Sequence, residues 1–301
     1  MKNLFLSLLI PVLSVQAFSQ NAFQTEVILA KENGENFQAW ITAATATDIR
    51  YKTSAVSTDF QDAKLTAFST IFLKEPPEYS EAMDLYEGRK YKEAQAKFAE
   101  VKDRFKPIAG LKDNHHTLAA FFEMESMRKQ GDLEGLANAL KSFIKAPLSR
   151  DYHLRQLDLY VLWDAVRTES WERVLPIAAE RDEESLPGDQ RAQVAYATGL
   201  ALENLKRPAE ALIAFNVAIT ADAGASEEIA QDAALAALRV YFADEEVQIA
   251  IGLWGTEDEN KNAGGYTRLT EAAALAAFYD KFLKVGKPLP DNLKKFLEYG
   301  V

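Results

Sequence analysis

Few residues of this 301-residue sequence are of types and spacings that could do chemistry. There is no cysteine, so thiolate nucleophiles, disulfides and cysteine-ligated zinc sites are excluded. The three histidines are His115, His116 and His153. Adjacent side chains of a helix point about 100° apart, so His115 and His116 are poorly placed to share a metal. We expect no metal site and interpret the pair as a polar helix start after Asp113-Asn114.

The acidic residues offer one dense run, Glu180–Glu184, with the sequence ERDEE. It has no apolar shelter that would raise a carboxyl pKa, so we interpret it as a solvated loop. Gly286-Lys287 lacks the remainder of a phosphate-binding loop, and no G-x-S-x-G motif occurs. We therefore expect no catalytic residue and no cofactor. One alternative stays open: an envelope enzyme or enzyme accessory that acts on a glycan or peptide through two carboxylates about 5–10 Å apart.

The stretch 191–223 indicates two helices folded back on each other. Small or apolar residues recur at helical spacing before and after Pro208: Ala195, Gly199 and Leu202, then Ala211, Phe215 and Ala218. Gly199 and Ala211 would let two helix backbones approach closely, and Phe215 would fill the space between them. We expect Gly199, Ala211, Phe215 and Ala218 to face inward.

Residues 78–105 repeat this pattern. Ala82, Ala94 and Phe98 stand at the places of Gly199, Ala211 and Phe215, with twelve residues from the first to the second and four more to the third. The stretch resembles the tetratricopeptide repeat, a helical hairpin with a period of about 34 residues. The resemblance implies a mainly α fold over residues 78–301, a right-handed α-solenoid of about five such hairpins.

The remaining helical segments match the repeat only in outline. Aromatic residues such as Tyr160 and Trp163 are expected in the core rather than in a ligand platform, because they recur at helical spacing. The expected helices are 116–129, 133–144, 152–167, 171–180, 227–242, 246–254, 270–283 and 291–299, with a long loop at 255–265.

Residues 23–74 have a different texture, with alternating apolar and polar residues typical of strands. Thr25–Leu29 is an expected strand, Asn33-Gly34 a tight turn, and 65–73 a further strand. The order of these elements weakly resembles Sm-like and SH3-like barrels, so we expect a small β-barrel or curled-sheet module. Glu75-Pro76-Pro77 then ends it as a linker.

The first nineteen residues contain Lys2, an apolar run and small residues at Ala17 and Ser19, which is typical of a cleaved signal peptide. We expect a periplasmic or otherwise exported protein, with no transmembrane segment after cleavage. Its formal net charge of −11 disfavours nucleic acid.

The resemblance to tetratricopeptide repeats also implies a concave groove formed by the first helix of each pair, in which a partner binds. Carried over by offset, the candidate groove residues are Tyr79, Met83, Tyr86, Glu87, Gln193, Tyr196, Leu200, Glu203 and Asn204. The expected function is therefore a scaffold or adaptor that binds protein or peptide segments in the cell envelope, without catalysis. Self-association through the helices is the third alternative.

Overall fold

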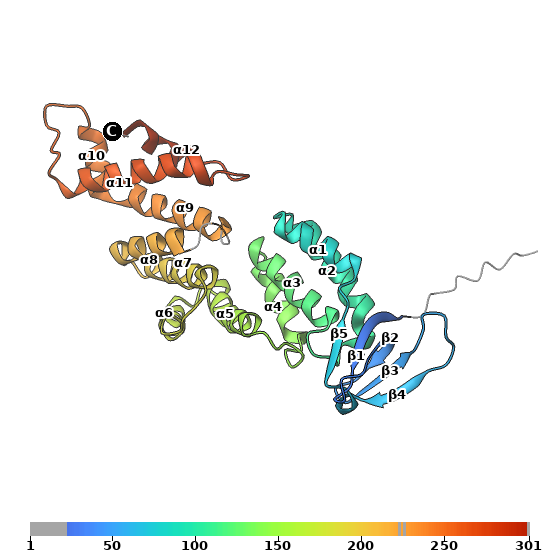
Figure 1. The fold of residues 1–301 in the computed structure, drawn as a ribbon. Helices are drawn as coiled ribbons and strands as arrows, with labels where there is room; N and C mark the ends of the chain where they lie inside the picture. Colours follow the sequence, from blue (N-terminus) through green and yellow to red (C-terminus); the bar gives the residue numbers. More distant parts are fainter. Residues whose placement is uncertain (1–22, 222–223, 225–226, 300–301) are drawn as a thin grey trace, which may run out of the picture.

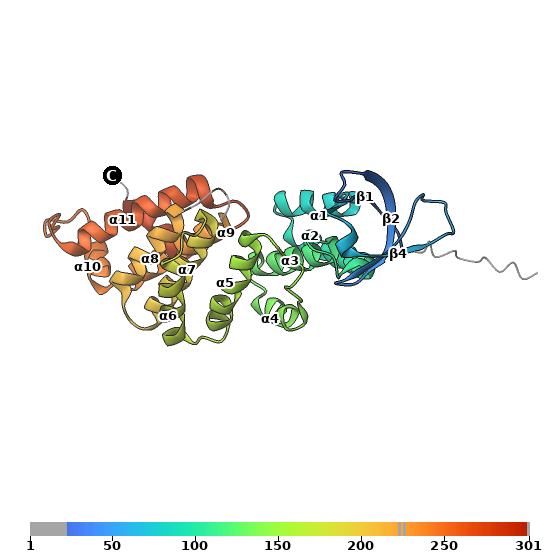
Figure 2. The same ribbon diagram turned by 60° about the horizontal axis from the view of Figure 1, so that its bottom comes forward.

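The computed structural model describes residues 23–221, 224 and 227–299. The signal peptide predicted over residues 1–19 lies outside this part of the chain. The fold is mainly α, with a small antiparallel sheet at its N-terminal end. Figures 1 and 2 show the sheet at one end of an elongated molecule and the C-terminal helices at the other.

Five strands form the sheet in the order β4-β3-β2-β1-β5. It is open, because β4 and β5 are its two edges, so the barrel alternative is not realised. One strand was predicted over residues 65–73, but the structure has a short 3₁₀ turn there, followed by β5. The strand β4 was not predicted, because its residues are mostly polar and do not alternate with apolar ones. The strands are β1 (Thr25–Ala30), β2 (Asn36–Ala44), β3 (Asp48–Lys52), β4 (Gln61–Lys64) and β5 (Thr70–Leu73).

The alternation predicted for the strands sets which face of the sheet is buried. Val27 and Leu29 of β1 and Ala39 and Ile41 of β2 are fully buried. On the opposite face, Ile28 of β1 pairs with Phe72 of β5, and both side chains are exposed. The hairpin between β1 and β2 closes at the predicted turn.

The helices follow from residue 77 in the order expected from the sequence. Their boundaries agree with the predicted ones to within a few residues, except that α11 begins six residues early. The helices are α1 (Pro77–Glu87), α2 (Tyr91–Phe105), α3 (His115–Lys129), α4 (Leu133–Ser142), α5 (Asp151–Arg167), α6 (Trp171–Asp182), α7 (Gly188–Asn204), α8 (Pro208–Ala221), α9 (Glu227–Ala243), α10 (Glu245–Leu253), α11 (Gly264–Phe278) and α12 (Asp291–Lys294).

The two hairpins with matching spacing have matching interiors. Ala82, Ala94 and Phe98 of α1 and α2 are fully buried, as are Ala211 and Phe215 of α8. A Cβ atom added at Gly199 of α7 would lie 2.4 Å from the Phe215 ring. The inward orientation predicted for Gly199 and Phe215 is therefore confirmed, and the ring occupies the space that a larger residue would need.

The early start of α11 also depends on a close approach. Gly265 lies in the first turn of α11 against α10, where an added Cβ atom would be 2.2 Å from the main-chain oxygen of Glu246. The sequence analysis assigned this Gly-Gly pair to a loop because glycine is a poor helix former. In the structure, the close packing of α11 on α10 requires a glycine at position 265.

The sheet packs on the connection between α2 and α3. Ile108 in this connection is fully buried, and Phe23 contacts Phe105 edge to face with ring centroids 5.5 Å apart. An added Cβ atom at Gly110 would lie 2.3 Å from the carbonyl carbon of Thr45, just beyond β2. The sheet and the first helices therefore share one core.

Candidate binding cavity

The nine candidate groove residues do not line one continuous surface. Tyr79, Met83 and Glu87 lie on one face of α1 and line a cavity of about 920 Å³ between the sheet and the first helices. We call it the junction cavity. Its walls come from β1, β5, the linker after β5, α1, and the starts of α3 and α5: Glu26, Val27, Ile28, Phe72, Leu73, Lys74, Glu75, Tyr79, Ser80, Met83, Asp84, Glu87, Asp113, His115, Leu118, Phe122, Arg150 and His153.

Tyr86 packs against other helices instead. Its ring contacts Tyr91 and Phe122 edge to face, with centroids 5.6 and 5.3 Å away. Burial raises the pKa of the Tyr86 hydroxyl well above its usual value. Tyr86 therefore holds α1 to α2 and α3.

Gln193 of α7 lies inside the interface with α5 and is 1 % exposed. Its side-chain amide exchanges two hydrogen bonds with that of Gln156, at 2.9 and 3.0 Å, and it accepts a third from the Trp163 indole at 2.8 Å. These bonds satisfy polar atoms that would otherwise be costly to bury. A partner could not reach Gln193 without separating the two helices.

Tyr196 and Leu200 of α7 are half-buried. The Tyr196 ring lies between Trp163 and Phe215, with centroids 6.3 and 6.1 Å away, and burial raises the pKa of its hydroxyl. Asn204 is exposed and donates a hydrogen bond to the Leu200 carbonyl at 2.9 Å.

Glu203 lines a second groove, of about 850 Å³, between α8, α9 and α11. Its carboxylate accepts two hydrogen bonds from the Arg239 guanidinium, at 2.8 and 2.7 Å. Arg268 in the same groove is paired with Asp244 and Glu246. Glu245 and Glu271 also line this groove, so it too has more carboxylates than cations.

Two of the three histidines are buried, which the sequence did not predict. His115 does begin α3, and the Asn114 side chain caps that helix by accepting from the Thr117 amide. However, His115 and His153 are both buried, at 5 % and 4 % exposed, and both line the junction cavity. Neither Nδ1 atom has a hydrogen-bond partner among the described residues.

Burial lowers the pKa of both imidazoles. Near His115, the negative charges of Glu75 and Glu78 partly oppose that effect, whereas Arg150 adds to it at His153. The His115 ring lies against Tyr79 and the His153 ring against Phe121, with centroids 5.2 and 4.5 Å apart. Two neutral imidazoles therefore form part of the cavity wall.

A buried ion pair lies beyond the junction cavity, between α3, α5 and α9. The Arg128 guanidinium donates two hydrogen bonds of 2.9 Å to Glu125, and the Tyr160 hydroxyl donates a third at 2.8 Å. Burial alone would raise the pKa of Glu125, but Arg128 lowers it below its usual value. Glu228 of α9 lies 3.5 Å from Arg128 and 2.8 Å from Lys129.

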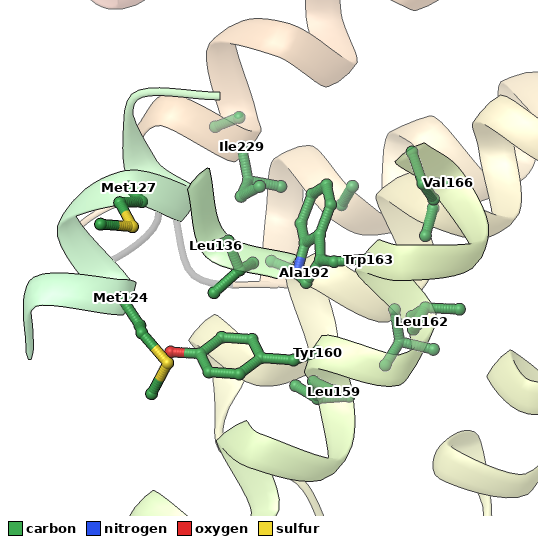
Figure 3. Close-up of a cluster of buried hydrophobic side chains, with 14 of the residues drawn as sticks. Met124, Met127, Leu136, Leu159, Tyr160, Leu162, Trp163, Val166, Ala192 and Ile229 are labelled. Atoms are coloured by element: carbon green, nitrogen blue, oxygen red, sulfur yellow. The ribbon is translucent and has the colours of Figure 1, made fainter. Parts of the chain in front are cut away.

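Figure 3 shows the apolar surroundings of this pair. Tyr160 of α5 points toward the side of the cluster that α3 forms with Met124 and Met127, and the Trp163 ring stands below Ile229 of α9. Tyr160 is 1 % and Trp163 is 6 % exposed, which confirms the prediction that they are core residues. The ion pair joins helices that are distant in sequence.

In the part of the chain that the structure describes, no three His, Asp or Glu side chains gather as a metal site would require. Nor is any helix of that part long and apolar enough to cross a membrane. Comparisons with models of protein families, with curated protein sequences and with solved structures found no match to this chain. The functional argument therefore rests on its own residues and geometry.

The sequence analysis missed most of the junction cavity. The contributions of Ile28, Phe72 and Arg150 depend on bringing the sheet next to helix starts that are distant in the chain, which no local pattern predicts. One signal was present for Ile28: an apolar residue on the polar side of an alternating strand.

Proposed function

We propose that this chain is an exported scaffold or adaptor of the cell envelope, without catalysis, and that its helices form a right-handed solenoid of tetratricopeptide-like pairs. Protein or peptide segments bind in the junction cavity. The observation that carries this proposal is the cavity itself, because its volume of about 920 Å³ is in the range of about 300–1,000 Å³ typical of ligand sites.

The wall chemistry supports a polypeptide ligand. Apolar side chains such as Ile28, Phe72 and Met83 alternate with carboxylates such as Glu87. Apolar contacts next to charged groups suit a chain with mixed side chains. The excess of negative charge over the whole sequence argues against nucleic acid.

The alternative of a carboxylate-dependent hydrolase lacks comparable support. A general acid needs a carboxyl group whose pKa is raised toward neutrality. In Glu26 of the cavity wall, the hydrogen bond from Lys74 lowers the pKa of the carboxyl group instead. Glu26 is therefore not suited to act as such an acid.

Site-specific photo-crosslinking in the native envelope tests the proposal. A photoreactive residue at position 87 samples the junction cavity, one at position 213 samples the second groove, and one at position 257 lies in the exposed loop between α10 and α11. We expect protein adducts at 87 that disappear when excess unlabelled chain competes. Absence of competable adducts at both 87 and 213 would contradict a scaffold role, and adducts only between copies of the chain would favour self-association.

A further inference from the structure

The junction cavity carries an excess of negative charge. Among its walls are five carboxylates against two cations, the histidines being neutral: Glu26, Glu75, Asp84, Glu87 and Asp113 against Lys74 and Arg150. Lys74 is already bound to Glu26, with their charged atoms 3.1 Å apart. Glu75 accepts from the Ser80 hydroxyl at 2.6 Å, and Asp113 accepts from the Ser149 amide at 3.0 Å; both donors are neutral groups that add no positive charge.

Asp84 and Glu87 are the most informative of these carboxylates. Both are exposed and lie in the last turn of α1, which contains no basic residue. Negative charge at a helix C-terminus is unfavourable by about 0.3–1 kcal/mol because it opposes the helix dipole. Neither side chain has an ion-pair or hydrogen-bond partner among the described residues, so both exposed carboxylates are free to pair with a cationic group of a ligand.

The walls also include two buried histidines and an edge strand. His115 and His153 are more than nine-tenths buried, and the Nδ1 atom of each lacks a partner in the described part of the chain. Both Nδ1 atoms are enclosed by protein atoms, so the two rings shape the wall and a bound main chain would reach these atoms only if the wall moved. In addition, β5 is an edge strand, and an extended segment can pair with such an edge.

Apolar side chains lie next to this edge. Phe72 of β5 is 66 % exposed and its cross-strand neighbour Ile28 is 51 % exposed, whereas Val27 and Leu29 on the other face of β1 are buried. A strand added at the free edge of β5 would have Phe72 as its direct cross-strand neighbour, with Ile28 one strand further in. The carboxylates, the edge strand β5 and the apolar pair of Ile28 and Phe72 all line the junction cavity.

We propose that the junction cavity binds an extended, basic peptide segment in which lysine or arginine alternates with large apolar residues. The basic side chains approach Asp84 and Glu87, and the apolar ones cover Ile28 and Phe72. This inference rests on the proposed scaffold function and specifies its partner. The charge excess decides in favour of a basic segment over an acidic one.

Fluorescence anisotropy of the purified full chain with labelled hexapeptides tests this proposal. One probe alternates lysine and leucine, a second has glutamate in place of each lysine, and a third is the lysine peptide with alternate amides N-methylated. We expect the first peptide to bind, the third to bind at least about tenfold more weakly than the first, and the second not to bind. Equal binding of the lysine and glutamate peptides, or no binding of the lysine peptide, would overturn the proposal.

Paired variants separate the cavity from the general charge of the chain. Asp84→Asn with Glu87→Gln should weaken binding of the lysine peptide about tenfold, which is about 1.4 kcal/mol. Its matched control, Glu257→Gln with Asp258→Asn, removes the same charge from an exposed loop and should leave affinity unchanged. Equal losses in both variants would overturn the assignment to the cavity.

A second pair of variants tests the apolar contact. Phe72→Ser should weaken binding, whereas Phe60→Ser, which removes an exposed phenylalanine outside the cavity, should not. Both positions are exposed, so both variants should fold. If the peptide fails to bind but envelope proteins still crosslink at position 87 or 213, the inference about the partner is wrong and the scaffold proposal survives.

Discussion

Gly199 shows at the scale of one residue how a small side chain decides the packing of two helices. The space beside its Cα atom is occupied by the Phe215 ring, which is fully buried in the same hairpin. The twelve-and-four spacing in the sequence identified this seam because each position of the pattern has one steric task.

Gly199→Ala should therefore destabilise the chain, although alanine is a better helix former by about 1 kcal/mol. The added methyl group must displace the Phe215 ring, and overpacking costs about 1–3 kcal/mol. Gly252→Ala is the matched control: it lies inside α10 with nothing within 4 Å of the added Cβ atom, so it should be stabilising. Thermal unfolding compares the two, and a Gly199→Ala variant as stable as Gly252→Ala would contradict this packing.

The two buried histidines make a second prediction at the residue scale. Their pKa values are lowered in the folded chain, so on acidification the unfolded chain takes up protons first, below its usual pKa of about 6.5. Stability is therefore complete above that value and falls as the pH is lowered toward the folded pKa, by about 1.4 kcal/mol for each pKa unit of difference.

Urea unfolding at pH 7.5, 6.5 and 5.5 measures this dependence. The variant with His115→Phe and His153→Phe keeps an aromatic ring at each position and removes both titrating groups, so its stability should change much less between pH 7.5 and 5.5. An unchanged slope in this variant would show that other groups cause the pH dependence.

At the scale of elements, the ion pair of Glu125 and Arg128 joins α3 to α5 and α9. Its side chains are 5 % and 3 % exposed, so each charge depends on the other for its stability in the interior. Three donors on one carboxylate also fix the angle at which Tyr160 of α5 meets α3.

Arg128→Met should cost about 3–5 kcal/mol, because it leaves the Glu125 carboxylate buried without its cation. The triple variant Glu125→Met, Arg128→Met and Tyr160→Phe removes every charged or hydroxyl group of the pair and should be more stable than Arg128→Met alone. Chemical unfolding of both variants checks this order. The reverse order would mean that the network stabilises the fold by more than charge compensation.

At the scale of the whole molecule, contacts between residues distant in sequence hold the parts together. The sheet meets the helices at Gly110 and Thr45, and the first helical pair meets the start of α9 through an ion pair of Arg89 with Glu227. The junction cavity lies between the sheet and the first helices, so its shape depends on the first of these contacts.

Gly110→Ala should therefore affect both stability and binding. Its methyl group meets the main chain of Thr45, which cannot rotate away as a side chain can, so a cost of about 1–3 kcal/mol is expected. Because the sheet must shift, the affinity for the lysine–leucine peptide should also fall. Thermal unfolding and anisotropy measure the two effects, and normal affinity with lowered stability would separate the cavity from this contact.

The sequence predicted the elements well and their assembly poorly. Helix starts and seams follow from local patterns, as at Pro208 and Gly199. Gln193 was assigned to a partner-binding surface by its offset from the small residue of the repeat, but its hydrogen-bond partners, Gln156 and Trp163, lie on another helix. Buried polar pairs of this kind, and a cavity whose walls meet only after folding, have no local signature.

The most direct test of the central claim, that the junction cavity is the binding site, is amide hydrogen exchange of the full chain with and without a saturating concentration of the lysine–leucine peptide. The account predicts slower exchange in β5, α1 and the start of α3, with α10 and α11 unchanged. Slowing that is confined to other helices, spread evenly over the chain, or absent despite binding would contradict it.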